Sequence, residues 1–177
     1  MKFSKAFVGL LALALGALFL IGPQFMKNYG IYLLSYWLVF TTATMGLNLT
    51  VGYAGQKSLG HGAFLGLGAY TAAILMPMGL SFWWALLAAG VVCFAVGVVL
   101  GFPALRVQTI YLAFATLGFN TAVWLVMRNE EWLTGGTYGI NNIARPSWGD
   151  FSFESNLRYY YLVLALTAIL ALLLAGL

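Results

Sequence analysis

The chain has 177 residues, of which 63% are hydrophobic and only 7% are charged, and its mean hydropathy is +0.94. A water-soluble domain of this length needs far more polar surface, so the composition excludes that class and predicts an integral membrane protein. The net charge of +4 comes from basic residues scattered along the chain. This scatter indicates a membrane-orientation signal and excludes a basic surface for nucleic acid.

Six apolar segments divide the chain. They are residues 6–22, 31–51, 59–76, 82–101, 105–127 and 159–177, and one polar segment, 128–158, separates the last two. A helix needs roughly 20 apolar residues to cross the hydrocarbon core of a bilayer, and segment 59–76 meets that length only marginally. We therefore expect an all-α integral membrane protein with about six transmembrane or re-entrant helices, arranged as a single domain over residues 1–177.

The first segment and the loop charges set the expected orientation. Segment 6–22 can be interpreted as an uncleaved helix or as a secretory signal peptide, and its apolar run continues past the weak cleavage site at 14–16, which favours the helix. Basic residues divide evenly between the two sides of the membrane if all six segments cross. Lys2 and Lys5 before the first segment then predict a cytoplasmic N-terminus, with loop 128–158 outside.

The acidic residues are confined to one part of the chain. All four lie between residues 130 and 154, and the first 129 residues contain no carboxylate side chain. Ion-coupled carriers commonly place Asp or Glu inside the membrane as the coupling group. If the chain transports a solute, its energy therefore comes from elsewhere, and an ion-coupled secondary carrier is the weaker alternative.

Residues 46–70 are unusually rich in glycine, with seven in 25 positions, and they carry polar side chains between apolar ones. Irregular backbone at membrane depth persists only against protein or a water-filled cavity. Broken helices of this kind form the solute sites of many transporters. The segment therefore predicts an interrupted helix beside a route for a solute.

Several features of the chain have plainer explanations. Small residues such as Gly66, Gly68, Gly97 and Gly101 are typical of tight packing between membrane helices. His61 is the only histidine, so we expect no metal site and favour a hydrogen bond within the bundle. A phosphate-binding loop ending in Lys57-Ser58 would require glycine at positions 51 and 56, which are Val51 and Gln56 here. No arrangement of residues supports catalysis, and we expect no enzyme activity.

The sequence resembles a known family over residues 31–146. The segment Gly46-Leu-Asn-Leu-Thr-Val-Gly-Tyr-Ala-Gly-Gln-Lys-Ser-Leu-Gly-His-Gly-Ala-Phe-Leu-Gly-Leu-Gly-Ala-Tyr-Thr-Ala-Ala is similar to the signature of the branched-chain amino acid ABC transporter permeases, and of their LivM-type subunits in particular. Tyr111-Leu-Ala, Thr116-Leu-Gly-Phe and Leu133-Thr-Gly-Gly-Thr-Tyr-Gly-Ile follow in the same order and spacing.

The resemblance implies a multi-pass subunit of a bacterial inner-membrane importer, forming part of a larger permease bundle. It implies as partners a second permease subunit, two cytoplasmic ATP-binding subunits, a periplasmic solute-binding protein and membrane lipid, with no nucleic acid. It also implies no cofactor in this chain, because the partner subunits use ATP.

The chain departs from the family pattern in three places. Family members continue past the position of Leu177 into a cytoplasmic docking loop, so we expect a truncated or partial permease. Thr121 and Trp124 stand where many relatives have Glu and Arg, and Gln108-Thr109 replaces Arg-Gly. Urea and short-chain amide permeases share the architecture, so they remain alternatives for the solute, and a non-transporting membrane remnant remains an alternative for the chain.

The expected solute path combines the interrupted segment with the turn at 134–140, which we expect near the outer face. Its candidate residues are Asn48, Gly52, Gly55, Gln56, Ser58, His61, Gly62, Thr134, Gly135 and Gly136. In this hypothesis the polar side chains contribute to the path, and the glycines between them permit the break in the backbone.

Overall fold

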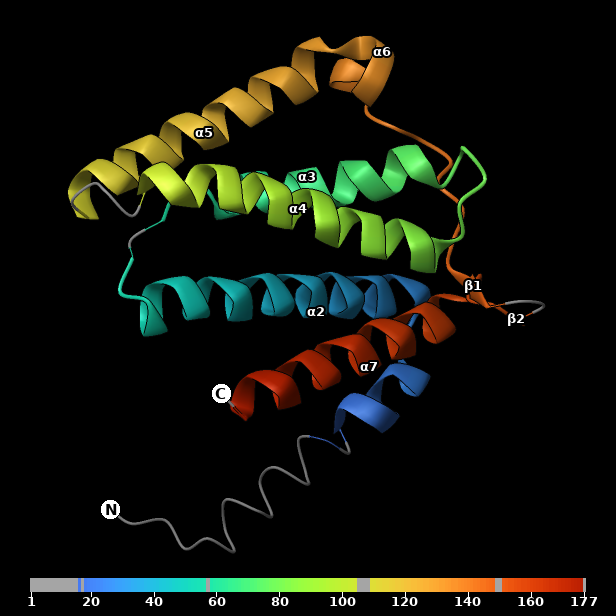
Figure 1. The fold of residues 1–177 in the computed structure, drawn as a ribbon. Helices are drawn as coiled ribbons and strands as arrows, with labels where there is room; N and C mark the ends of the chain where they lie inside the picture. The colour runs from blue at the N-terminus through green and yellow to red at the C-terminus, as the bar shows by residue number, and fades with distance from the viewer. Residues whose placement is uncertain (1–15, 17, 57, 105–108, 149–150, 177) are drawn as a thin grey trace, which may run out of the picture. The chain divides into compact units, whose positions relative to one another are not determined.

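The computed structural model describes residues 16, 18–56, 58–104, 109–148 and 151–176. These residues form helices almost throughout, with one pair of two-residue strands (Figure 1). The expected all-α membrane fold class is confirmed. The chain divides into two compact units, one containing residues up to Thr41 together with Phe153 onward, and the other containing Thr42–Ser152.

The first unit is built from the short helix η1 (Gly22–Phe25), the first part of α2 (Asn28–Asn48) and α7 (Asn156–Ala175). Ile31 and Leu38 of α2 form its small core with Tyr160 and Val163 of α7. Tyr160 is fully buried, and its hydroxyl donates a hydrogen bond of 2.9 Å to the carbonyl of Phe19. The polar end of this large side chain is therefore satisfied inside an apolar core.

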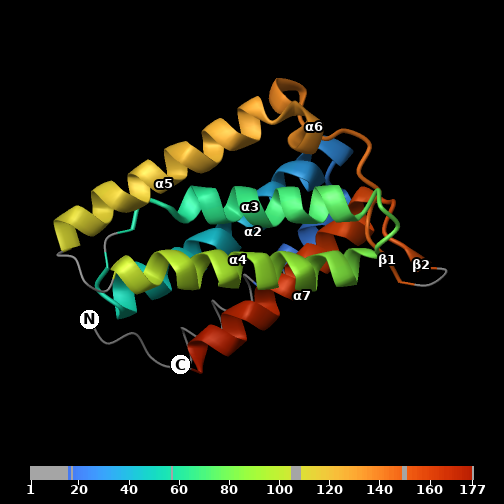
Figure 2. The same cartoon turned by 45° about the horizontal axis from the view of Figure 1, so that its top comes forward.

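The second unit contains most of the helices. It holds the end of α2, η2 (Leu49–Tyr53), α3 (His61–Leu75), α4 (Phe82–Ala104), α5 (Thr109–Asn129), α6 (Glu131–Thr134), η3 (Gly136–Tyr138), β1 (Ser147–Trp148) and β2 (Phe151–Ser152). Helix α3 packs along α4 and also contacts α5 and α6 (Figure 2). It is therefore the central helix of this unit.

Small residues permit the close packing of α3. A Cβ atom added at Gly68 would lie 3.6 Å from Cys93 Sγ on α4, and one added at Gly97 would lie 3.8 Å from the ring of Phe64. The Cys93 thiol also donates to the Phe64 carbonyl at 3.5 Å. Gly101, which we expected to pack in the same way, has nothing within 4 Å among the described residues.

Three described helical stretches are long and apolar enough to cross a membrane: Asn28–Tyr53, Phe82–Phe102 and Asn156–Leu174. They overlap the expected segments 31–51, 82–101 and 159–177. Helix α3 has 15 residues and spans about 22 Å at 1.5 Å per residue, less than the roughly 30 Å hydrocarbon core. It overlaps the expected segment 59–76, which the sequence already marked as marginal.

Two expected segments fall partly outside the described residues. In segment 6–22 only residues 16 and 18–22 are described, and residues 16 and 18–21 are helical. In segment 105–127 residues 105–108 lie outside the description, and α5 begins at Thr109 and continues to Asn129. Helix α4 continues three residues past the expected end of segment 82–101, to Ala104.

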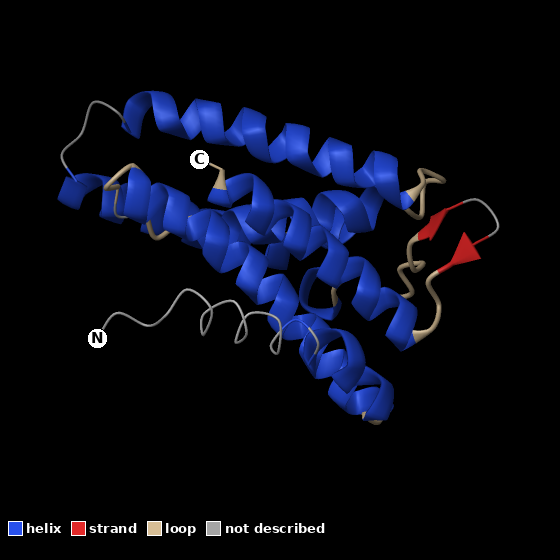
Figure 3. Cartoon of the chain, turned by 90° about the horizontal axis from the view of Figure 1, so that it is seen from below, coloured by secondary structure: helices blue, strands red, loops and turns tan. Residues whose placement is uncertain are grey.

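The expected loop 128–158 is more structured than the sequence indicated. It contains α6, η3 and the two short strands, which Figure 3 shows in red. The strands are antiparallel, with Trp148 opposite Phe151. Trp83 at the start of α4 donates from its indole nitrogen to the Ser147 carbonyl at 3.1 Å, and its ring lies 5.0 Å from that of Trp148. Helix α7 then begins at Asn156, three residues before the expected start.

Candidate functional site

The helix is interrupted where the glycine-rich segment predicted it. Helix α2 ends at Asn48, and η2 continues it as a single π-helical turn through Tyr53. The backbone then reverses at Gly55, whose φ of +64° is the left-handed conformation that glycine adopts without strain. Single π-helical turns often occur at functional sites, so this break is a candidate site on geometric grounds.

His61 forms a hydrogen bond across the break. Its Nε2 lies 2.6 Å from the carbonyl oxygen of Ala43 near the end of α2. Because a carbonyl only accepts, Nε2 carries the proton in this contact. A Cβ atom at Gly46 would lie 3.3 Å from His61 Cε1, so glycine at this position leaves room for the ring. The histidine therefore joins the two sides of the break.

The start of α3 is held against α5. The backbone nitrogen of Leu59 donates to Thr116 Oγ1 at 2.9 Å. A Cβ atom at Gly60 would lie 3.3 Å from the Thr116 carbonyl oxygen, and one at Gly62 would lie 3.1 Å from Asn120 Oδ1. The glycines thus allow close approach to α5, and Thr116 is a contact residue that the candidate set omitted.

The remaining residues of the break have local roles. Gln56 is half-buried, and its backbone nitrogen donates to the Thr50 carbonyl at 3.1 Å. Ser58 Oγ accepts from the backbone nitrogen of Gly60 at 3.4 Å. A Cβ atom at Gly52 would lie 2.7 Å from Asn48 Oδ1, so these two candidates are in close contact.

Thr134, Gly135 and Gly136 form a cap at the end of α6. The Thr134 hydroxyl lies 2.6 Å from the Met127 carbonyl oxygen and accepts from the backbone nitrogen of Gly136 at 3.2 Å. Gly135 and Gly136 both have positive φ, at +74° and +56°. A Cβ atom at Gly135 would overlap the carbonyl group of Gly139. Only glycine fits this turn, which is a common way to end a helix.

The ten candidate residues therefore form two groups. One group surrounds the break at the start of α3, where Gly60 and Gly62 meet α5. The other is the cap, which lies beside Thr71 and Ile74 in the last turns of α3. Because α3 is about 22 Å long, the structure does not bring the two groups together.

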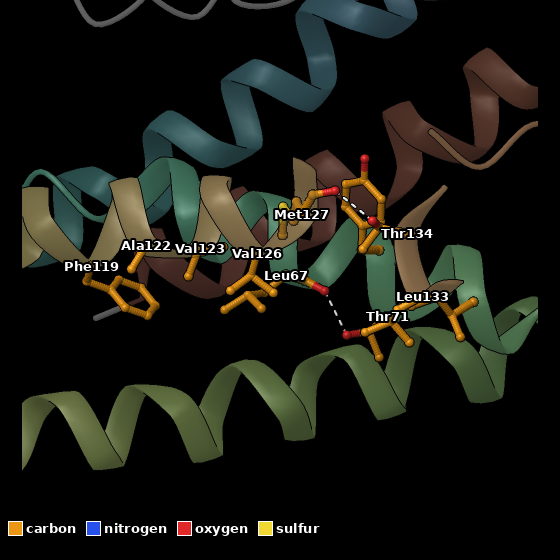
Figure 4. Close-up of a pocket in the computed structure, with 11 residues that line it drawn as sticks. Leu67, Thr71, Phe119, Ala122, Val123, Val126, Met127, Leu133 and Thr134 are labelled. Atoms are coloured by element: carbon orange, nitrogen blue, oxygen red, sulfur yellow. Dashed lines mark hydrogen bonds between the residues drawn. The ribbon is translucent and has the colours of Figure 1, made fainter. Parts of the chain in front are cut away.

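A cavity of about 300 Å³ lies between α3 and α5 and is bounded by α6. We call it the α3–α5 groove. Its wall is apolar and includes Leu67, Phe119 and Val123 (Figure 4). The hydroxyl of Thr71 donates to the Leu67 carbonyl, and that of Thr134 lies within hydrogen-bond distance of the Met127 and Glu130 carbonyls. The protons of both hydroxyls therefore point to backbone carbonyls. The sequence did not reveal this groove, because the apolar residues of α5 that line it have the same spacing as the apolar residues of any helix packed against a neighbour.

Comparison with known proteins defines the family. The chain matches the family described as the permease component of the branched-chain amino acid transport system over residues 29–176. It is 41% identical over 122 residues to the high-affinity branched-chain amino acid transport system permease protein LivM of Salmonella typhimurium, and 40% identical over 122 residues to LivM of Escherichia coli K12. Each match covers 68% of this chain and 29% of the relative. No solved structure matches.

The chain therefore belongs to the family of branched-chain amino acid transport permeases, and it is a multi-pass protein of the inner membrane. The aligned region spans less than a third of the length of the two LivM proteins.

Proposed function

We propose that this chain is a permease subunit of an ATP-binding-cassette importer for branched-chain amino acids and forms part of the solute path. The observation that carries the proposal is the family match over residues 29–176, with two LivM relatives at 40–41% identity. The carboxylate-free first 129 residues agree with it, because an importer driven by ATP needs no coupling carboxylate in its spans.

The proposed importer contains further subunits, and this chain catalyses no reaction in it. A second permease subunit, two cytoplasmic ATP-binding subunits and a periplasmic solute-binding protein complete the importer. The partner subunits hydrolyse ATP, and this chain acts without a cofactor and without enzyme activity. Its contribution is a path that alternates between the two sides of the membrane.

The break in the helix at residues 49–60 is the proposed part of the path. The π-helical turn ends with bonds from the backbone nitrogens of Ala54 and Gln56 to the carbonyls of Leu49 and Thr50, and the reversal at Gly55 stops the pairing of peptide groups that a continuous helix would make. Gln56 and Ser58 add polar side chains to the same segment. Backbone groups of this kind can replace part of the hydration of a zwitterionic solute in a lipid environment.

The function is tested by uptake of radiolabelled leucine into proteoliposomes that contain the assembled complex and the solute-binding protein. We expect uptake that requires internal ATP and is insensitive to dissipation of ion gradients. Uptake that persists without ATP would contradict the proposal and favour an ion-coupled carrier. Competition by urea or acetamide, with no competition by valine, would contradict the solute assignment.

The path is tested by substitutions within the break. Gln56→Ala and Gly55→Val should lower leucine uptake by about tenfold while the protein still inserts, because they alter the polar lining and the reversal. Gly79→Val is the matched control. Gly79 also has positive φ, +95°, and a Cβ atom there would meet none of the described residues within 4 Å, but it lies in the turn between α3 and α4. Equal uptake in the Gly55 and Gly79 variants would exclude the break from the path.

A further inference from the structure

A second cavity adjoins the α3–α5 groove and is more polar. It measures about 420 Å³, and it shares Tyr70 and Met127 with the groove. Trp124, Arg128 and Thr137 complete most of its wall. The apolar groove therefore continues into a cavity that carries a positive charge at the end of α5.

The cation in this second cavity has no anionic partner among the described residues. The Arg128 guanidinium carbon lies 5.1 Å from the centre of the Trp124 ring, a cation–π contact that positions the side chain. Arg128 forms no ion pair with any acidic residue that the structure describes. The hydroxyl of Tyr70, between the two cavities, has no hydrogen bond to the described part of the chain. Both groups are thus available to a ligand.

We propose that the α3–α5 groove and the adjoining cavity bind a branched-chain amino acid on its way through the permease. The aliphatic side chain lies against the apolar wall near Val123, and the α-carboxylate accepts hydrogen bonds from the Arg128 guanidinium. The Tyr70 hydroxyl is a further donor to the carboxylate. This proposal rests on the proposed function and adds a solute contact outside the break at residues 49–60.

The arrangement accounts for a choice among solutes. A branched aliphatic group gains from the apolar wall, whereas the amide of urea or acetamide would lose hydrogen bonds to water there. The hydroxyls of Thr71 and Thr134 cannot compensate fully, because their protons are directed at backbone carbonyls. Urea and acetamide also lack the carboxylate that Arg128 would bind. The aliphatic group and the carboxylate of a branched-chain amino acid therefore each have a complement in the groove and the adjoining cavity that urea and acetamide cannot use.

The charge is tested with Arg128→Gln in the assembled complex. Hydrogen bonds to a charged group are strong, so we expect the rate of leucine uptake at a leucine concentration well below half-saturation to fall about tenfold or more. Lys27→Gln is the control, because it removes an exposed cation outside the groove and should leave the rate unchanged. The amount of complex in the membrane is measured for both. An unchanged rate in Arg128→Gln would overturn the proposal.

The role of the apolar wall is tested by enlarging one of the side chains that form it. Val123→Phe fills the groove and should lower the ratio of leucine to valine uptake several-fold, because the larger solute is excluded first. Leu125→Phe is the matched control on the same helix, since Leu125 is exposed and lies outside the groove wall. Equal leucine-to-valine ratios in the two variants would overturn the proposal. Poor assembly does not affect this test, because the ratio is independent of the amount of complex in the membrane.

An anionic lipid offers the same chemistry as the amino acid, an apolar chain beside a negative group. The two sources are separated in vesicles of phosphatidylcholine alone and vesicles with added phosphatidylglycerol. Equal sensitivity to Arg128→Gln in both supports the amino acid. Dependence of the unaltered complex on phosphatidylglycerol, lost in Arg128→Gln, would assign the groove to lipid and overturn the proposal.

Failure of this inference differs from failure of the proposed function. If the unaltered complex takes up leucine with ATP and the groove variants behave as their controls, only the groove proposal is wrong. If the unaltered complex takes up no leucine, the proposed function is wrong and this inference falls with it.

Discussion

Gly135→Ala should destabilise the second unit strongly, through two separate effects. The residue ends α6 with a φ of +74°, and an alanine in the left-handed region costs about 1–2 kcal/mol. Its new Cβ atom would also lie 2.8 Å from the carbonyl carbon of Gly139, a backbone atom that can move only if the turn moves. Overpacking of this kind costs about 1–3 kcal/mol more. We expect a total loss of about 2–5 kcal/mol in the free energy of unfolding.

The measurement is an SDS titration of the protein in mixed micelles, followed by circular dichroism. Gly79→Ala provides the matched control, because Gly79 also has positive φ but a Cβ atom there would have no neighbour within 4 Å in the part of the chain that the structure describes. It should lose only the conformational term of about 1–2 kcal/mol. Midpoints that shift equally in the two variants would refute the argument from overlap, since they would show that the turn yields at no cost.

Three further contacts give smaller expected effects. Trp83→Phe removes the indole donor to the Ser147 carbonyl, so proteinase K should cut within residues 141–148 faster than in Trp84→Phe. Trp84 is exposed and makes no such bond to the described residues, so equal rates would contradict this. Thr116→Val leaves the backbone nitrogen before α3 without its acceptor and should cost about 1 kcal/mol in the SDS titration. Thr121→Val removes only a bond within α5 and should cost less than about 0.5 kcal/mol, so equal losses would disprove the role assigned to Thr116. His61→Ala should cost about 0.5–1.5 kcal/mol, and His61→Gln, which can still donate, should cost less; no loss in either would show that the bond to α2 adds nothing.

Sequence reasoning located the interruption but not the contacts that shape it. Seven glycines with polar residues between 46 and 70 indicated a broken helix. Irregular backbone at membrane depth occurs only where it is buried in protein or lines a water-filled cavity. The hydrogen bond from His61 to Ala43 joins residues 18 apart, and that from Leu59 to Thr116 joins residues 57 apart. The periodicity of a sequence does not predict hydrogen bonds between residues so far apart, since each bond depends on how the helices pack.

The cap at Thr134–Gly136 shows the same difference. The sequence identified a turn from adjacent glycines, and that local feature follows from backbone sterics alone. The sequence placed this turn on the same path as the break but near the outer face, and in the structure the two groups lie toward opposite ends of α3, which is about 22 Å long. Distance along a helix is set by its length, and only the packing of α6 against α3 placed the cap at the far end.

Composition by itself determined that this protein belongs in lipid, because 63% hydrophobic residues cannot be covered in water, and the order of its motifs determined the family. Tertiary structure decided which apolar side chains face a neighbour and which line a cavity. Val123 and Leu125 are two similar residues on one helix, yet only Val123 lines the α3–α5 groove. The reason is geometric. Successive residues of a helix point in directions that differ by a fixed angle, but the position of the neighbouring helix determines which of these directions face it and which face open space.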